Sequence, residues 1–167
     1  MRQSKRNAAA GLGGCLLAVA GGLLLLPASR AEASLMQDIA GRWTGWGTIN
    51  LAGGSREQVK CVATYFVEDG GKGLKQNLRC ASSSYKIDAT SQLALNGSSV
   101  SGTWSELTYA KTGAVSGQVT GGGFNLSIKG DAFTAAMNIA SSNCKQSVNI
   151  RPQGLDVTSV AISLSKC

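Results

Sequence analysis

The segment 59–82 constrains the fold more than any other, because it has the pattern of a β-hairpin with one cysteine in each arm. Apolar and polar residues alternate on both sides of Gly70-Gly71, as expected of two half-buried strands joined by a turn. Folding the segment at these glycines places Cys61 opposite Cys80. Facing Cβ atoms in such a ladder lie roughly 4.5–5.5 Å apart, near the reach of a disulfide. The segment therefore predicts a hairpin stapled by Cys61–Cys80.

The same alternation continues along the chain, and two further turn signals stand out. Asn96-Gly97 is typical of a tight hairpin turn, and a register centred on it pairs Leu93 with Val100. A register centred on Gly130-Asp131 pairs Phe124 with Met137. Ten strands are expected, at residues 41–51, 56–67, 74–82, 85–95, 98–109, 114–120, 124–129, 132–140, 144–151 and 157–166.

Short Gly, Asn, Asp and Ser turns join these strands, so strands that follow each other in sequence should be neighbours in the sheet. That arrangement favours an up-and-down meander over a Greek key. A meander of this size removes its exposed edges by closing. The predicted fold is all-β, an antiparallel up-and-down β-barrel of about 8–10 strands stapled by disulfides. Residues 34–40 are expected to form a short helical turn or an unstructured lead-in.

The N-terminal segment has the features of a signal peptide. Basic residues precede a long apolar stretch that Pro27 ends, and Ala31-Glu32-Ala33 is an A-x-A cleavage motif. We therefore expect residues 1–33 to be removed and residues 34–167 to form a single barrel domain. A retained membrane anchor is the alternative. A lipoprotein site at Cys15 fits poorly, because this cysteine lies inside the apolar stretch.

Four of the five cysteines remain after the predicted cleavage. An even number in a small exported domain indicates disulfides, and four cysteines allow three connectivities. We favour Cys61–Cys80 and Cys144–Cys167. The second pair conflicts with the register that faces Val148 with Leu164, so it requires a bulge or a bond beyond the end of regular pairing. The protein is accordingly expected to be exported, either periplasmic or secreted.

The composition argues against several classes of function. The chain has no histidine, which removes the commonest general base, metal ligand and haem ligand. With the thiols oxidised, we predict no metal site, no cofactor and no enzymatic activity. Part of the net charge of +7 belongs to the predicted leader, and the remaining basic residues are scattered along the chain. No basic cluster suggests a nucleic-acid partner, so none is expected. After cleavage no membrane span is predicted, and the polar outward positions disfavour an outer-membrane barrel.

The first predicted strand begins G-R-W-T-G-W-G at residues 41–47 and resembles the G-x-W opening of the calycins. The spaced glycines are similar to the first strand of nitrobindin-type ten-stranded barrels. This resemblance implies a closed barrel in which Trp43 plugs one end, as the corresponding Trp does in lipocalins. It does not carry over the haem chemistry, because this chain has no histidine to hold iron. The overall pattern also resembles uncharacterised exported bacterial proteins.

Barrels of this size can enclose one ligand. The leading hypothesis is therefore an exported, non-catalytic binding protein that holds a small apolar or amphipathic ligand inside the barrel. Trp104 and Glu106 share one face of their strand, and Glu106 is expected opposite Ile87. The candidate ligand-binding residues are Tyr65, Trp104, Phe124 and Met137, with Glu106 as a polar anchor.

The alternative is an envelope or extracellular protein-interaction module, such as a protease inhibitor. It predicts a packed core and an exposed aromatic patch at one barrel rim, around Trp46 and Tyr109. Its partner would be an envelope protein rather than a small molecule.

Overall fold

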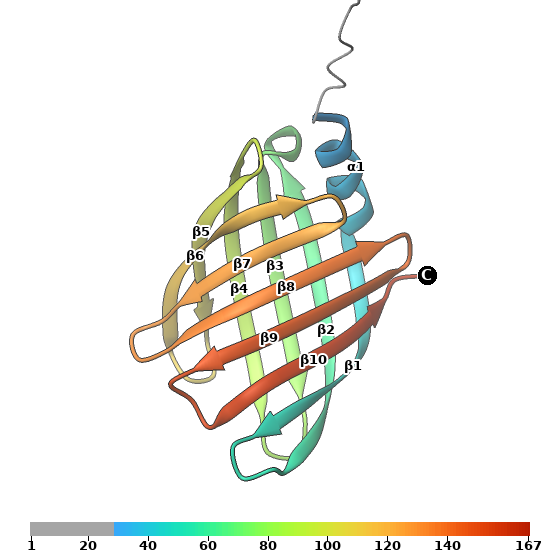
Figure 1. The fold of residues 1–167 in the computed structure, drawn as a ribbon. Helices are drawn as coiled ribbons and strands as arrows, with labels where there is room; N and C mark the ends of the chain where they lie inside the picture. The colour runs from blue at the N-terminus through green and yellow to red at the C-terminus, as the bar shows by residue number, and fades with distance from the viewer. Residues whose placement is uncertain (1–28) are drawn as a thin grey trace, which may run out of the picture.

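A computed structural model describes residues 29–167, which form one α-helix, one short 3-10 helix and ten strands (Figure 1). The elements are α1 (Ser29–Ile39), β1 (Gly41–Leu51), β2 (Arg56–Glu68), η1 (Asp69–Gly71), β3 (Gly73–Ala81), β4 (Lys86–Asn96), β5 (Ser99–Glu106), β6 (Lys111–Thr120), β7 (Gly123–Lys129), β8 (Thr134–Ser142), β9 (Lys145–Gln153) and β10 (Val157–Ser165). Within this part of the chain, no helix is long and apolar enough to cross a membrane.

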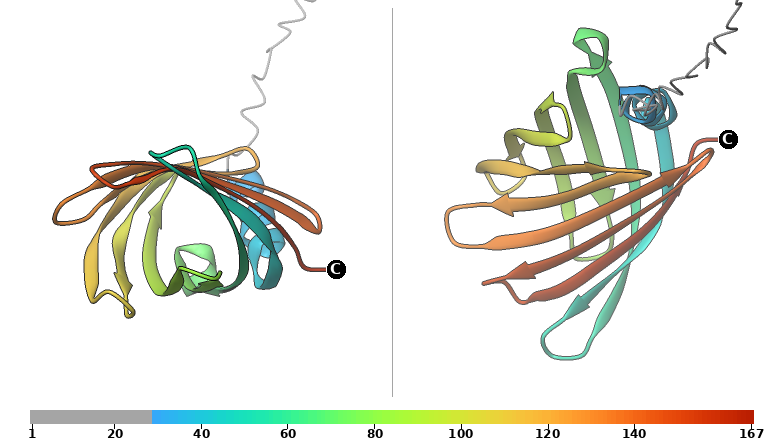
Figure 2. Two further views of the ribbon diagram at one scale, coloured as in Figure 1. Left: turned by 90° about the horizontal axis from the view of Figure 1, so that it is seen from below. Right: turned by 45° about the horizontal axis from the view of Figure 1, so that its top comes forward.

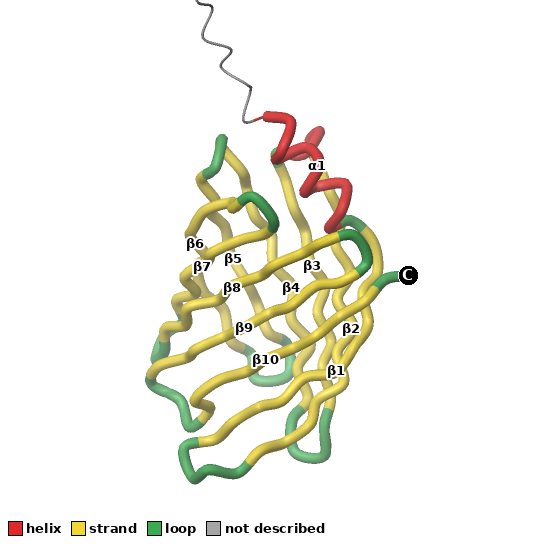
Figure 3. The backbone as a smooth tube through the Cα atoms, turned by 45° about the vertical axis from the view of Figure 1, so that its right-hand side comes forward, coloured by secondary structure: helices red, strands yellow, loops and turns green. Residues whose placement is uncertain are grey.

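The ten strands form a closed antiparallel barrel in which each strand pairs with its neighbours in sequence (Figures 1 and 3). Pairing of β1 with β10 closes the barrel, so no strand is left with a free edge. The predicted all-β, up-and-down, disulfide-stapled barrel is confirmed. The predicted strands differ from the observed ones by a few residues at their ends, where pairing gives way to turns.

Gly45 and Gly47 allow β1 to lie close against β10. A Cβ atom built on Gly45 would lie 1.9 Å from the carbonyl oxygen of Ser163, and one on Gly47 would lie 2.6 Å from that of Ala161. No side chain fits at these distances. The spaced glycines in the first strand therefore mark the point where the barrel closes.

The predicted registers are partly right. Cys61 faces Cys80, as expected. The β4–β5 register is shifted by two residues from the prediction, so Val100 faces Leu95 rather than Leu93. The cause is a loop centred one residue later than predicted, and the same shift pairs Phe124 with Ile139 across β7 and β8. A shift of two residues keeps every side chain on its predicted face.

Both predicted cysteine pairs lie at disulfide distance, Cys61–Cys80 and Cys144–Cys167. The second bond forms beyond the last regular β9–β10 pair, where the Lys166 N–H donates to the Cys144 carbonyl at 3.1 Å. Val148 faces Ile162 rather than Leu164, and the disulfide is compatible with this register because it lies past the last regular pair, as one of the two predicted solutions requires. Two disulfides indicate a location outside the reducing cytoplasm.

Helix α1 lies against one end of the barrel, which we call the helix end (Figures 1 and 2). The loops β1–β2, β3–β4, β5–β6, β7–β8 and β9–β10 form the opposite end, which we call the far end. Leu35, Met36 and Ile39 are buried and pack into the core cluster. The segment is thus a regular helix rather than the short helical turn expected from the sequence.

Trp43 and Lys166 hold the C-terminus of α1 in place. The Trp43 indole N–H donates to the Ile39 carbonyl at 2.8 Å, and the Lys166 ammonium donates to the Asp38 carbonyl. Lys166 Nζ also lies 5.0 Å from the centre of the Trp43 ring, a cation–π contact. Trp43 is fully buried, so its expected role in closing one barrel end is confirmed.

Removing either disulfide should destabilise the barrel. The bonds close loops of 19 and 23 residues, for which loop entropy predicts about 3 kcal/mol each. C61A/C80A should cost more than C144A/C167A, because Cys61 is completely buried and its loss also leaves a cavity. Urea unfolding of the two double variants would measure this. Equal midpoints for both variants and the unmodified protein would contradict it.

Candidate ligand-binding interior

The inner face of the barrel is mostly apolar. Buried inward side chains alternate with exposed outward ones along most strands, whereas in β4 the residues from Ile87 to Ser91 are all partly buried. Several inward side chains in the middle of their strands are nevertheless only partly buried. These residues are Leu78, Ala89, Ser91, Met137 and Ile150. Because these side chains project from the inner face, the surface that they expose faces the barrel interior.

Five polar side chains form a chain of hydrogen bonds across this interior, which we call the polar belt. Ser91 Oγ donates to Gln76 Oε1 at 3.2 Å, and Gln76 Nε2 donates to the Tyr65 hydroxyl at 3.1 Å. Tyr65 then donates to Gln146 Oε1 at 2.9 Å, and Gln146 Nε2 donates to Ser141 Oγ at 2.9 Å. The belt joins β4, β3 and β2 on one side of the barrel to β9 and β8 on the other.

Burial makes the centre of the belt sensitive to any lost partner. Tyr65 and Gln146 are each only 3% exposed, so water cannot replace a missing hydrogen bond there. Burial raises the pKa of Tyr65 to about 12, although its bonds with Gln76 and Gln146 act in the opposite direction. Every buried polar side-chain atom in residues 29–167 has a hydrogen-bond partner.

Glu106 ends β5 and organises the following loop. Its carboxylate accepts hydrogen bonds from the backbone N–H groups of Asp88, Thr108 and Tyr109, at 2.9, 3.0 and 2.6 Å. Burial would raise the pKa of this carboxyl, but the three backbone donors outweigh burial and lower it. Glu106 faces Ala89, not Ile87 as expected. These contacts give it a structural role in the loop, while its role as a ligand anchor stays a prediction.

Glu57 is the other acidic residue on the inner face of the described strands, and it too is held at the far end. Its Oε1 accepts from the Ser83 hydroxyl at 3.0 Å and from the Ser84 N–H at 2.7 Å. The Ser82 hydroxyl and the Ser84 amide lower the pKa of Glu57 to about 2. The one lysine or arginine at an inward position of β1–β10 is Lys111, which is exposed opposite Glu106, and no ion pair joins the two within the described residues. Both acidic groups are therefore compensated by hydrogen bonds rather than by cations.

The other candidate residues also lie on inner faces, at different positions between the helix end and the far end. Phe124 is fully buried, and Met137 is partly exposed to the interior. Trp104 lies near the far end, where its indole N–H contacts the Lys129 carbonyl at 3.3 Å and its ring packs 5.7 Å from that of Phe133. Tyr65 is bound into the polar belt. The five candidates share the inner face but do not form one cluster.

The sequence analysis missed most of the polar belt. Gln76 could have been found, because the predicted hairpin register already places it opposite Tyr65. Gln146 could not, since it reaches Tyr65 from a strand that lies on another side of the barrel. No local pattern in the sequence encodes that contact.

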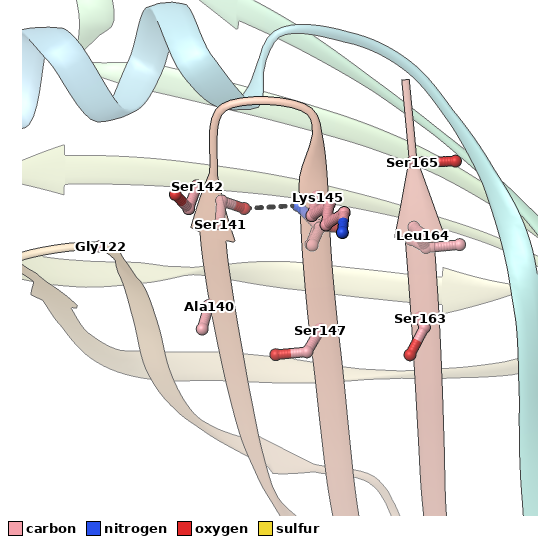
Figure 4. A pocket seen from close by; sticks show the side chains of 10 residues that line it. Gly122, Ala140, Ser141, Ser142, Lys145, Ser147, Ser163, Leu164 and Ser165 are labelled. Carbon is pink, nitrogen blue, oxygen red and sulfur yellow. Dashed lines mark hydrogen bonds between the residues drawn. The ribbon is translucent and has the colours of Figure 1, made fainter. Parts of the chain in front are cut away.

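The outer wall of β8, β9 and β10 carries a shallow hollow lined mainly by small side chains (Figure 4). Ala140, Ser147 and Ser163 are exposed there, and the dashed line at Ser141 is its hydrogen bond from Gln146. The hollow is lined by a single charged residue, Lys145, and a single large apolar residue, Leu164, which is buried. It adds no second candidate for a ligand site.

The exposed aromatic residues do not form the single rim patch expected of a protein-interaction module. Trp46 is 59% exposed on the outer wall of β1, next to Lys60, whose ammonium lies 5.7 Å from the ring centre. Tyr109 is 52% exposed in the β5–β6 loop. In the barrel order, β1 and β5 are separated by three strands. The structure thus gives no support for an envelope partner at this patch.

Comparison with solved structures identifies the fold. The S-type phycobiliprotein lyase CPES from Guillardia theta aligns with a TM-score of 0.59 at 11% identity, over 83% of this chain and 96% of that chain. Rv2717c from M. tuberculosis aligns with a TM-score of 0.62 at 10% identity, over 81% and 97%. The chain shares the calycin-like barrel fold. No protein-family model matches it, and no curated protein matches its sequence.

These comparisons correct one expectation from the sequence. The sequence predicts no enzymatic activity, because the chain has no histidine and its thiols are expected to be oxidised. That conclusion is contradicted, because a solved barrel of the same fold is a phycobiliprotein lyase, an enzyme class. The lack of an obvious catalytic motif in a calycin-like barrel is therefore no argument against catalysis.

Removing the Tyr65 hydroxyl should destabilise the protein and change its response to alkaline pH. Y65F removes a hydrogen-bond partner from the buried Gln146 amide and from the partly buried Gln76 amide, at a cost of about 1–3 kcal/mol in the free energy of unfolding. The raised pKa means that unfolded Tyr65 ionises before folded Tyr65 does. Its contribution to stability is therefore complete below about pH 10 and is lost as the pH rises toward 12.

Urea unfolding at several pH values would measure both effects. The unmodified protein should lose about 3 kcal/mol more than Y65F between roughly pH 10 and pH 12. Comparison with Y65F removes the contribution of lysine titration, which both proteins share. Parallel pH profiles for the two proteins would show that Tyr65 is not buried in the way described.

Proposed function

We propose that this protein binds a small apolar or amphipathic molecule inside its barrel. The observation that carries the proposal is the partial exposure of inward side chains at mid-strand positions such as Leu78, Ala89 and Met137. An apolar lining that water can reach gains free energy when an apolar ligand displaces that water, about 25 cal/mol for each Å² buried. Pockets of this kind, with few polar groups, are the usual sites for small ligands.

The loops at the far end offer the route of entry. Leu107 and Leu155, in the β5–β6 and β9–β10 loops, are 68% and 48% exposed. At the helix end, α1 and the polar belt occupy the corresponding space. Trp104 would then line the entrance, while Phe124 and Met137 would contact the ligand further inside. The similarity to the lyase supports a barrel of this kind but does not identify a ligand.

Filling the interior should abolish binding. A89F places a large side chain on the inner face, while A136F makes the same change on the exposed outer wall of β8. Fluorescence of N-phenyl-1-naphthylamine, a neutral apolar probe, should rise with the unmodified protein and with A136F. With A89F the signal should fall at least about tenfold. Absence of probe binding to the unmodified protein, together with no co-purifying small molecule by mass spectrometry, would refute the proposed function.

We also propose that the protein is exported and that residues 1–33 are its signal peptide. Residues 1–28 lie outside the described part of the chain, and the predicted cleavage point falls within α1. The buried side chains described in α1 begin at Leu35. Removal of residues 1–33 would therefore leave the packing of Leu35, Met36 and Ile39 intact. The two disulfides support the same location.

Expression of the full chain in a bacterial host should yield a periplasmic product that begins at Ser34. Intact mass spectrometry and N-terminal sequencing would identify its first residue, and alkylation without reduction would show no free thiol. A variant with Ala31→Leu and Ala33→Leu should accumulate uncleaved at the membrane. A cytoplasmic product with an intact N-terminus and free cysteines would contradict export.

A further inference from the structure

At one end of the polar belt, Gln76 and Ser91 have hydrogen-bonding capacity that the belt does not use. Gln76 Nε2 uses one of its two protons on Tyr65, and Ser91 Oγ acts as a donor while its lone pairs stay available. In residues 29–167, no acceptor is described for the second Gln76 proton. Both side chains are on the inner face and partly exposed to the interior. The central members of the belt, Tyr65 and Gln146, are buried.

The surroundings of this pair are apolar. Leu78 and Ala89 are the next inward residues on β3 and β4 toward the far end, and both are partly exposed. A ligand whose apolar part covers these residues would bring its end group to Gln76 and Ser91. The Gln76 proton could then bind a carbonyl or hydroxyl oxygen, and Ser91 could accept from a hydroxyl or amide.

Charge limits what that end group can be. The one lysine or arginine at an inward position of the ten strands is Lys111, exposed at the far end of β6 opposite Glu106, so a carboxylate or phosphate placed at Gln76, toward the helix end, would not have that cation beside it. An unpaired buried charge costs several kcal/mol. The two inward carboxylates, Glu57 and Glu106, lie toward the far end and would add repulsion for an anion that enters there.

We propose that Gln76 and Ser91 form the head-group site of the barrel, and that this site selects amphipathic ligands with an uncharged hydroxyl, carbonyl or amide head. The inference rests on the proposed binding function and narrows its ligand class. Fatty alcohols, monoacylglycerols and primary amides fit it. Free fatty acids in their ionised form do not, nor do phospholipid-like anions.

The test compares 1-decanol, decylamine and decanoate as competitors of N-phenyl-1-naphthylamine at pH 8. Decanol should compete at least about tenfold better than decanoate, since one factor of ten corresponds to about 1.4 kcal/mol. Lowering the pH through the carboxyl pKa should bring decanoic acid close to decanol. Equal competition by decanol and decanoate, or stronger competition by decylamine, would overturn the head-group assignment.

Variants of the site give a second, independent readout. Q76M should reduce the advantage of decanol over decane, because its side chain cannot donate a hydrogen bond. Q76K should reverse the preference, because an ammonium group at the belt pairs with decanoate. Asn77 faces outward on the same strand, so N77M and N77K are the matched controls and should change neither preference.

The outcomes separate the two proposals. If the probe does not bind at all, the proposed function fails. If the probe binds but the competitors and the Gln76 variants show no head-group preference, the proposed function stands and this inference fails. Circular dichroism and thermal melting confirm that each variant is folded. Should Q76K not fold, the comparison of ligands on the unmodified protein still decides the question.

Discussion

Closure of the sheet through β1 is the constraint on which the rest of this structure depends. β1 pairs with β2 on one side and with β10 on the other, so the first and last strands must meet. Their approach leaves no room for a side chain at Gly45 or Gly47. Once the barrel is closed, every backbone group in the wall has a partner and all inward side chains face one shared space. Each other feature of the molecule depends on that shared space.

The two ends of the barrel differ in which parts of the chain cover them. At the helix end, buried apolar side chains of α1 and the hydrogen bonds at Trp43 and Lys166 close the opening. The polar belt lies inside and ties opposite walls together through Tyr65 and Gln146. At the far end, Glu106 organises a loop with exposed apolar residues. One end is thus packed and the other is bordered by loops, as a ligand entrance requires.

The polar belt also explains how a mostly apolar barrel could select its ligand. Its buried centre is fully hydrogen-bonded and contributes rigidity, while its outer members keep spare donors and acceptors. Specificity would come from the high cost of burying an unpaired charge beside neutral amides. The similar solved barrels share only 10–11% of their residues with this chain, so a common fold need not imply a common ligand.

The sequence by itself determined the local structure. Alternation with a period of two predicted the strands and their inner faces, turn residues predicted the hairpins, and Cys61 opposite Cys80 set one register. It was accurate there because these features depend on neighbours within about twenty residues. It centred two loops one residue too early, at Asn96-Gly97 and Gly130-Asp131, because turn residues alone do not fix which pair lies at the centre of a loop.

Only the tertiary structure decided which distant groups meet. Tyr65 bonds to Gln146, Lys166 reaches the end of α1, and Glu106 accepts a hydrogen bond from the backbone N–H of Asp88. These contacts join residues that closure of the barrel brings together, and hairpin patterns carry no information about them. The candidate site was therefore predicted as a set of inward positions. The hydrogen bonds among those residues could not be predicted, because they depend on closure of the sheet.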